Sequence, residues 1–278
     1  MSLFPDRHPQ KDFFILDIAD VVPKDDTASM EHPLFSLATK PDMRHLLYES
    51  GDSRLEITPS YNGLPTIFDK DILIFCISQL MHLKNRGEQI GKRVRFTGRE
   101  LLVATNRPTN NLGYQRLEQA FKRLRGTTFK TDIRTGNKME TRIFGLIDEG
   151  GFVMRDDGSW RLDYCEVVLS DWLMRAIESN EVVTISPDYF RLRKPLARRL
   201  YELARKHCGH QTSWAIGLDL LREKSGSKSS LREFRRAVRA IEADDSLPEY
   251  RFVVGHDDKV TFYMRDGTRL IRGITKRA

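Results

Sequence analysis

Two stretches of the chain repeat one pattern: residues 114–124 read YQRLEQAFKRL, and residues 231–241 read LREFRRAVRAI. In both stretches, apolar residues stand at the first, fourth, seventh, eighth and eleventh places. This spacing puts them in one stripe along a helix, so each stretch is predicted to be a helix with one packed face. The other places are polar and mostly basic. The apolar residues are Tyr114, Leu117, Ala120, Phe121 and Leu124, and Leu231, Phe234, Ala237, Val238 and Ile241.

A shorter helix is predicted directly before the first repeated helix. Thr97 is followed three residues later by Glu100, which is the pattern of a capping box, so a helix is expected over residues 98–104. Residues 106–111 contain one proline and three asparagines and are expected to form a turn. The repeated helix is then predicted over residues 112–125.

The second copy has the same order of elements. A short helix is predicted over residues 217–224, followed by a serine-rich turn over residues 225–230. The second repeated helix is predicted over residues 231–243, with Ser229 or Ser230 as its cap. The chain therefore contains a duplicated supersecondary unit rather than a short solenoid repeat.

A strand pair is expected after each repeated helix. Residues 127–134 and 139–146 are rich in β-prone side chains and flank a Gly-Asn pair, which is a signal for a tight hairpin. Residues 250–255 and 260–264 are the corresponding pair in the second copy. A helix, a turn, a basic helix and a hairpin form the outline of a winged helix-turn-helix, in which the hairpin is the wing. The predicted fold class is therefore α+β, with two tandem winged helix-turn-helix domains.

Further elements lie outside the two repeated units. A helix is predicted over residues 68–84, with Asp69 as its cap, and another over residues 187–207, in which Pro195 marks a break. Residues 161–169 are expected to form a strand. The predicted division is an N-terminal arm, partly disordered, over residues 1–30, a first winged-helix domain over 31–180, a second over 181–266, and a basic C-terminal tail over 267–278.

The charge is unevenly distributed along the chain. The net charge is +7, but residues 1–90 hold nine Lys/Arg and fourteen Asp/Glu. Residues 92–142 hold thirteen basic and four acidic residues, and residues 191–239 hold fourteen basic and four acidic residues. Each basic block contains one of the repeated helices. Basic helix faces are usually just solvated, but two blocks of this excess favour a polyanionic partner, namely double-stranded DNA.

Cysteine usage and hydropathy indicate the compartment. The three cysteines, Cys76, Cys165 and Cys208, are far apart and odd in number, which argues against a disulfide scaffold and for a reducing environment. The N-terminus lacks the pattern of a signal peptide, and the most apolar run, residues 72–83, is too short and too polar to span a bilayer. We therefore expect a cytoplasmic bacterial protein associated with DNA and no membrane partner.

The candidate DNA contacts are the polar side chains of the repeated helices, their turns and their wings. Lys and Arg at phosphates give affinity without sequence information, whereas Arg and Gln at base edges read guanine and adenine. For any single arginine, an ion pair with a neighbouring Glu is an equally good interpretation. The candidates are Gln115, Arg116, Gln119, Lys122, Arg123, Lys130, Arg134, Lys138, Lys228, Ser229, Ser230, Arg232, Arg235, Arg236, Arg239 and Lys259.

Motifs for catalysis and for metal or nucleotide binding are incomplete in this sequence. Residues 87–93 resemble a phosphate loop, but one residue is missing between the glycines and Arg93 replaces the Ser or Thr that binds Mg²⁺. His207 and His210 lack a second ligand pair at zinc-finger distance. The prediction is therefore a protein that is not an enzyme and has no catalytic residues, no metal site and no cofactor.

The order of elements, together with two short phrases, resembles a known family. Residues 12–18 read DFFILDI and residues 30–37 read MEHPLFSL, and with the first helix-turn-helix through Arg125 they are similar to the plasmid replication initiator protein A family. The resemblance implies two winged-helix domains that bind repeated origin sites, melt adjacent duplex and recruit the host initiator and helicase. It also implies a homodimer that represses its own gene, a monomer that binds the origin, and stronger base readout by the second domain.

Two other functions are compatible with the same helices. One is a winged-helix transcriptional repressor, in one version a repressor of its own gene, that binds an operator and never opens DNA. The other is a nickase or nuclease, against which the missing nucleophile and metal motifs count. The leading interpretation is a plasmid replication initiator that acts by binding and bending DNA.

Overall fold

The computed structural model describes residues 13–16, 33–50, 53–135, 138–155, 161–179, 182–208 and 211–265. At residues 13–16, 50, 53, 133–135, 138, 139 and 161, it describes the backbone only. The chain divides between Thr184 and Ile185 into two compact units, each described by itself below as the N-terminal and the C-terminal unit. Both consist of helices and antiparallel sheets, which confirms the mixed fold that the sequence predicts.

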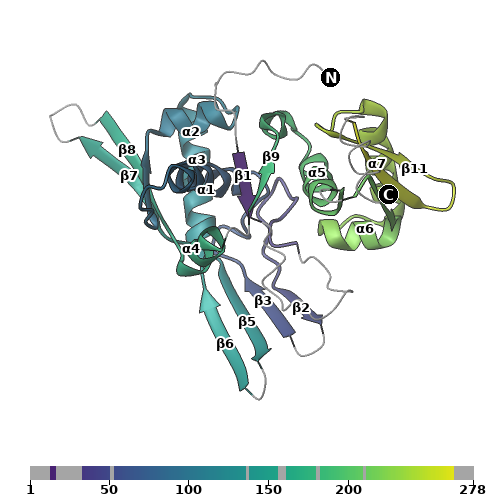
Figure 1. The fold of residues 1–278 in the computed structure, drawn as a ribbon, viewed down its shortest axis with the longest axis horizontal. Helices are drawn as coiled ribbons and strands as arrows, with labels where there is room; N and C mark the ends of the chain where they lie inside the picture. The colour runs from purple at the N-terminus through teal and green to yellow at the C-terminus, as the bar shows by residue number, and fades with distance from the viewer. Residues whose placement is uncertain are drawn as a thin grey trace. The chain divides into compact units, whose positions relative to one another are not determined.

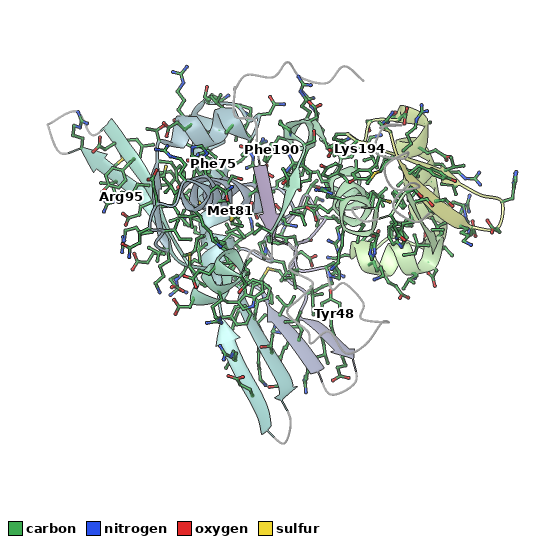
Figure 2. The ribbon with its side chains drawn as sticks, viewed as in Figure 1. Tyr48, Phe75, Met81, Arg95, Phe190 and Lys194 are labelled. Atoms are coloured by element: carbon green, nitrogen blue, oxygen red, sulfur yellow. The ribbon has the colours of Figure 1, made fainter. Side chains whose placement is uncertain are left out.

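The helices of the N-terminal unit form around one buried helix, α1. Its residues are buried along most of its length, and the Phe75 ring, labelled in Figure 2, meets that of Phe96 edge-on with 5.1 Å between centroids. The predicted capping box at Thr97 and Glu100 is confirmed, and it starts α2 where expected. The helices are α1 (Lys70–Asn85), α2 (Gly98–Ala104), α3 (Asn111–Gly126) and α4 (Asp171–Glu178).

Three antiparallel sheets belong mainly to the N-terminal unit, and Figure 1 shows two of them leaving the helices in different directions. The first has the strand order β4-β8-β7, the second β2-β3-β5-β6, and the third pairs β1 with β9. The strands are β1 (Phe13–Leu16), β2 (Leu46–Ser50), β3 (Ser53–Thr58), β4 (Arg93–Phe96), β5 (Thr128–Thr135), β6 (Lys138–Phe144), β7 (Ile147–Arg155), β8 (Arg161–Leu169) and β9 (Val182–Ile185).

The C-terminal unit repeats the order of a helix, a strand, two helices and a hairpin. Its sheet has the order β10-β12-β11, so the strand before the helix pair lies against the last strand, just as β4 lies against β8. The aromatic rings of Trp214 and Phe262 stack on the inner side of this sheet. The elements are η2 (Pro187–Arg191), α5 (Pro195–Cys208), β10 (Ser213–Gly217), α6 (Leu218–Ser225), α7 (Leu231–Asp244), β11 (Tyr250–Val254) and β12 (Lys259–Met264).

The predicted hairpin over residues 127–146 is confirmed, because β5 pairs with β6. This hairpin, which the sequence analysis assigned as the first wing, lies in a sheet with β2 and β3, so it is not the counterpart of β11 and β12. The strands equivalent to β11 and β12 are β7 and β8, because β8 lies against the strand that precedes the helix pair. The sequence analysis did not predict β7, because its two glycines, Gly150 and Gly151, are not typical of a strand. At Gly150, a Cβ would lie only 3.1 Å from the Phe121 ring, so glycine lets β7 pass close to α3.

Two predicted helix starts gain detail in the structure. The predicted break at Pro195 is confirmed: the segment over residues 187–207 is a short 3-10 helix followed by α5, which begins at Pro195, because proline fits the first position of a helix but not its interior. Asp69 directly precedes α1 but makes no capping hydrogen bond. Its carboxylate instead accepts a hydrogen bond from the Thr66 backbone and pairs with Arg123.

The apolar stripes of the repeated helices are buried in the main, although Tyr114 and Leu231 at their first places are only half-buried. In α3, Leu117, Ala120, Phe121 and Leu124 are buried, and in α7 so are Phe234, Val238 and Ile241. Ala237 is exposed instead, although Ala120 at the equivalent place is buried near β7. Ala237 is therefore not part of the core.

The three cysteines are buried and unpaired, and burial raises the pKa of each thiol, for Cys208 to about 11. Within the described ranges, no helix has both the length and the apolar character needed to cross a bilayer.

Candidate nucleic-acid interface

The first repeated helix, α3, sits very close to the turn that precedes it. The Asn110 side chain accepts a hydrogen bond from the Gly113 backbone and caps the helix. A Cβ at Gly113 would lie 2.0 Å from the Pro108 carbonyl oxygen, a distance that no side chain can occupy. Glycine is therefore required here for the helix and the turn to approach each other.

The two repeated helices present equivalent outward faces. In α7, the buried residues are spaced i, i+4, i+7, and the positions two residues earlier lie on the opposite side of the helix. The same relation holds in α3. These outward positions are Gln115, Gln119 and Lys122 in α3, and Arg232, Arg236 and Arg239 in α7.

The outward face of α7 carries three available cations. Arg232, Arg236 and Arg239 are exposed, and among the described residues none of them has a hydrogen bond or an ion pair. The helix start is fixed by a capping box between Ser230 and Glu233. The hydrogen bond from Ser230, and to a smaller extent the charges of Arg236 and Arg232, lower the pKa of the Glu233 carboxyl, so it stays ionised beside the arginines.

The outward face of α3 is polar but less charged. Gln115, Arg116 and Gln119 are exposed. Lys122 is also exposed, but its ammonium group lies 2.6 Å from the carboxylate of Glu118, one turn earlier. Such a surface pair is weak and exchanges readily, so Lys122 remains available to a stronger anion.

Arg123 is held by an ion pair inside the N-terminal unit. Its Nε lies 2.7 Å from Oδ2 of Asp69 and its Nη2 lies 2.8 Å from Oδ1, and its side chain is only 18% exposed. The hydrogen bonds that Arg123 donates to Asp69 raise the pKa of Arg123. Releasing this group would leave a buried carboxylate without its cation, so Arg123 holds α3 in place.

Arg235 is also held within the protein. Its Nε donates a hydrogen bond of 2.8 Å to Asp258, in the turn between β11 and β12, and this bond is the main cause of the lowered pKa of Asp258. Lys259 is exposed next to this turn. In the turn before α7, Lys228 is exposed, and Ser229 lies with its hydroxyl 2.8 Å from that of Ser227.

The remaining predicted DNA contacts lie on the hairpin of β5 and β6, which the sequence analysis assigned as the first wing. Lys130 of β5 is partly exposed and lies 3.9 Å from Glu56 of the neighbouring strand. The side chains of Arg134 and Lys138 lie outside the described residues. The structure therefore does not bring Lys130 to the hairpin that corresponds to β11 and β12.

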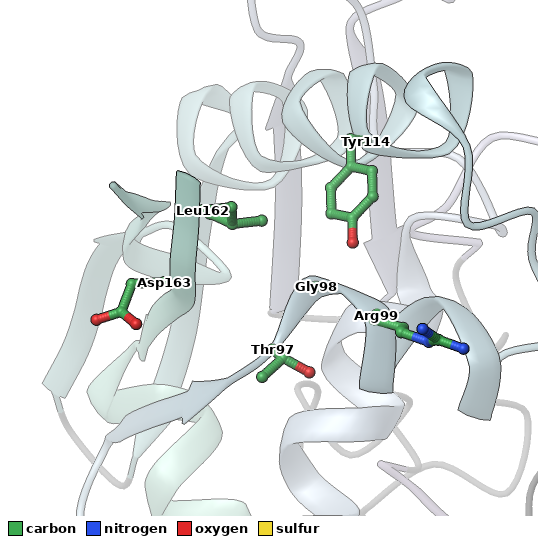
Figure 3. A pocket seen from close by; sticks show the side chains of 6 residues that line it. All are labelled: Thr97, Gly98, Arg99, Tyr114, Leu162 and Asp163. Atoms are coloured by element: carbon green, nitrogen blue, oxygen red, sulfur yellow. The ribbon is translucent and has the colours of Figure 1, made fainter. Parts of the chain in front are cut away.

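Sequence reasoning missed the basic residues around the β7–β8 hairpin. Arg155 near its tip lies 2.7 Å from Asp163, and Arg95 of β4, labelled in Figure 2, hydrogen-bonds Glu166 at 2.6 Å. Between the start of β8, α2 and α3 is a pocket of about 280 Å³, with Tyr114 reaching from α3 toward the start of α2 (Figure 3). The pairing of β4 with β8 is the feature that identifies this hairpin, and the sequence analysis did not predict it. The pocket is lined by Thr97, Gly98, Arg99, Tyr114, Leu162 and Asp163.

No metal-ligand cluster is present in the part of the chain that the structure describes. His207 stacks on the Trp214 ring with 4.1 Å between centroids. His210 lies outside the described residues.

The family model described as replication initiator protein A matches residues 24–252. The chain belongs to the replication initiator protein A family. This initiator is also 36% identical over 259 residues to a protein of Wigglesworthia glossinidia brevipalpis named "Putative replication protein", with 92% of this chain and 94% of that protein covered. The resemblance seen in the sequence is thus confirmed, and the chain has a role in the initiation of DNA replication.

Two crystal structures of domains 2 and 3 of RctB resemble this initiator. Their TM-scores are 0.59 and 0.62, each at 12% sequence identity. They cover 86% and 84% of this chain and 97% and 95% of the RctB chains. At this level of identity, the likeness concerns the fold alone, and it extends over both units.

Proposed function

We propose that this initiator binds repeated sites in a plasmid origin as a sequence-specific double-stranded DNA-binding protein with two winged helix-turn-helix domains. The observation that carries the proposal is the outward face of α7. Arg232, Arg236 and Arg239 are exposed at i, i+4, i+7 spacing, opposite the buried stripe. A helix with one packed face and one cationic face is suited to a major groove.

Equivalent positions of the two helices carry different side chains, which suggests that the two units read different bases. Gln115 and Gln119 of α3 correspond to Arg232 and Arg236 of α7. Glutamine pairs best with adenine, and arginine with guanine. We therefore propose that the N-terminal unit reads A·T-containing positions and that the C-terminal unit reads G·C-containing positions while contributing more of the contact with phosphates.

Origin opening and recruitment of the host initiator and helicase are further parts of the proposal, and they rest on the family. The energy for opening would come from binding and bending DNA, with no catalytic step by the protein itself. Permanganate sensitivity of A·T-rich DNA next to the bound site tests opening. A plasmid-nicking assay with Mg²⁺ tests the absence of catalysis, and Mg²⁺-dependent nicking by the purified chain would refute it.

The experiment that tests the binding proposal is footprinting on the DNA that flanks the chain's own gene. Protection of direct repeats about two helical turns apart supports an initiator that uses both units. Protection of one inverted repeat without permanganate sensitivity would instead support the repressor. Protection that is equal on all sequences would contradict sequence-specific binding.

A further inference from the structure

The residue directly before the first helix of each unit pairs with the repeated helix of the same unit. In the N-terminal unit, Asp69 precedes α1 and pairs with Arg123 of α3. In the C-terminal unit, Lys194 precedes α5 and pairs with Asp244, the last residue of α7, at 2.5 Å. The same two elements are thus joined in both units, but the acid and the base have exchanged places.

The N-terminal pair is buried and strongly held. The Asp69 side chain is 4% exposed and also accepts a hydrogen bond of 2.7 Å from the Thr66 backbone. Nearby, Asp71 of the same helix start accepts a hydrogen bond of 2.7 Å from Arg107, in the turn before α3. Two carboxylates at the start of α1 therefore hold both the turn and the later part of α3.

The C-terminal pair is more accessible to water. The side chains of Lys194 and Asp244 are 41% and 33% exposed. The hydrogen bond from Lys194 lowers the pKa of the Asp244 carboxyl, so this carboxylate is ionised near neutral pH. Dissolved salt competes with an exposed pair much more than with a buried one.

We propose that the pairs Asp69–Arg123 and Lys194–Asp244 are positioning latches, which set the angle at which the outward faces of α3 and α7 meet DNA. This inference rests on the proposed function for its effect on DNA reading. A latch that fixes the helix direction favours the matching sequence over others, because base contacts need closer geometry than phosphate contacts. Its loss should therefore reduce discrimination more than total affinity.

The exposed pair allows a clean test in the full-length chain. The variants are Lys194→Ala, Asp244→Ala and the exchanged pair Lys194→Asp with Asp244→Lys. The probes are a 40-bp duplex selected by the wild-type chain from a random pool and the same duplex with its sequence shuffled. We expect each single variant to lower the ratio of the two affinities about two- to fivefold, and the exchanged pair to restore it.

The matched control is the ion pair of Asp188 and Arg191, which lies in the same unit at 2.6 Å but does not involve α7. Asp188→Ala and Arg191→Ala change the net charge as the latch variants do, and should leave the affinity ratio unchanged. For the buried pair, Asp69→Asn should also lower the ratio, and its thermal unfolding midpoint shows whether the variant is folded.

Backbone amide exchange of residues 240–244, measured without DNA, reports the position of α7 directly. The single latch variants should speed this exchange, and the exchanged pair should slow it again. Unchanged exchange would overturn the latch, and faster exchange with an unchanged affinity ratio would overturn its role in reading DNA. If the wild-type chain selects no sequence while the latch variants still speed exchange, the proposed function fails and the latch remains.

Discussion

Arg235 and Arg236 are adjacent in α7, but their surroundings give them different roles. Arg235 is held by Asp258, whereas Arg236 points outward and has no ion pair among the described residues. Because one helical position differs from the next by about 100°, only Arg236 shares a face with Arg232 and Arg239. The distinction depends on tertiary structure and is not visible in the sequence.

Replacing each of these two arginines should therefore have a different effect. Arg236→Ala is expected to weaken binding to the selected DNA site by about 1–3 kcal/mol and to relax the preference at one base pair. Arg235→Ala should instead lower the thermal unfolding midpoint and change base preference little. Fluorescence titration and thermal unfolding measure the two effects. If Arg236→Ala lowers the affinity for selected and for shuffled DNA equally, Arg236 contacts phosphates rather than bases.

Gly113 is expected to be essential for the N-terminal unit. Gly113→Ala places a methyl group 2.0 Å from the Pro108 carbonyl oxygen, so the turn must move, at a cost of at least about 1–3 kcal/mol of unfolding free energy. Gly91→Ala is the matched control, because no atom lies within 4 Å of its Cβ position. Urea unfolding measures both variants, and similar stabilities would contradict the close approach seen in the structure.

Asp245 is expected to make the stability of the C-terminal unit depend on pH in the acidic range. Hydrogen bonds from Arg251 and Arg265 lower the pKa of this carboxyl from 3.8 to about 2. The folded-state pKa is depressed, so the stabilisation is complete above about pH 4 and is lost as the pH falls toward 2. Asp245→Asn should therefore be less stable than the wild type at pH 6, and the difference should shrink below pH 4. A difference independent of pH in urea unfolding would contradict this assignment.

At the scale of elements, short-range patterns could be predicted from the sequence and long-range pairing could not. The capping box at Thr97 and the stripe around Phe121 depend on neighbours within a few residues, so their sequence signals are complete. The hairpin of β7 and β8 was not predicted as the counterpart of β11 and β12, because pairing of β4 with β8 joins residues about seventy positions apart. The ion pair of Arg123 was not predicted because its partner, Asp69, is 54 residues away.

The corrected hairpin leads to a prediction about two similar arginines. Arg155 of β7 and Arg142 of β6 are both exposed and each pairs with a carboxylate, Asp163 and Glu140 respectively. If β7 and β8 form the wing, Arg155→Ala should weaken binding to all duplexes about equally and reduce the salt slope by about 1. Arg142→Ala should leave both unchanged. Titrations from 50 to 200 mM salt measure this, and the opposite result would return the wing to β5 and β6.

At the scale of the whole molecule, the two units have the same order of elements, but the outward faces of α3 and α7 differ in charge. The family match spans residues 24–252 and the fold likeness to RctB covers more than four fifths of the chain, so both units belong to the initiator. In the sequence, the two basic blocks have nearly equal excess charge. The structure separates them at the outward faces, because that of α3 carries one cation, Lys122, whereas that of α7 carries three arginines.

This difference should appear when each outward face is removed from the full-length chain. Replacing Arg232, Arg236 and Arg239 by alanine removes three available cations, so the slope of log affinity against log salt should become shallower by up to about 3. Replacing Gln115, Gln119 and Lys122 removes one cation, so the slope should change by at most about 1 while preference at A·T positions is lost. Titration of the selected and shuffled duplexes at several salt concentrations separates the two results. Equal changes in slope would mean that the two helices contact phosphates to the same extent, and the proposed division between them would fail.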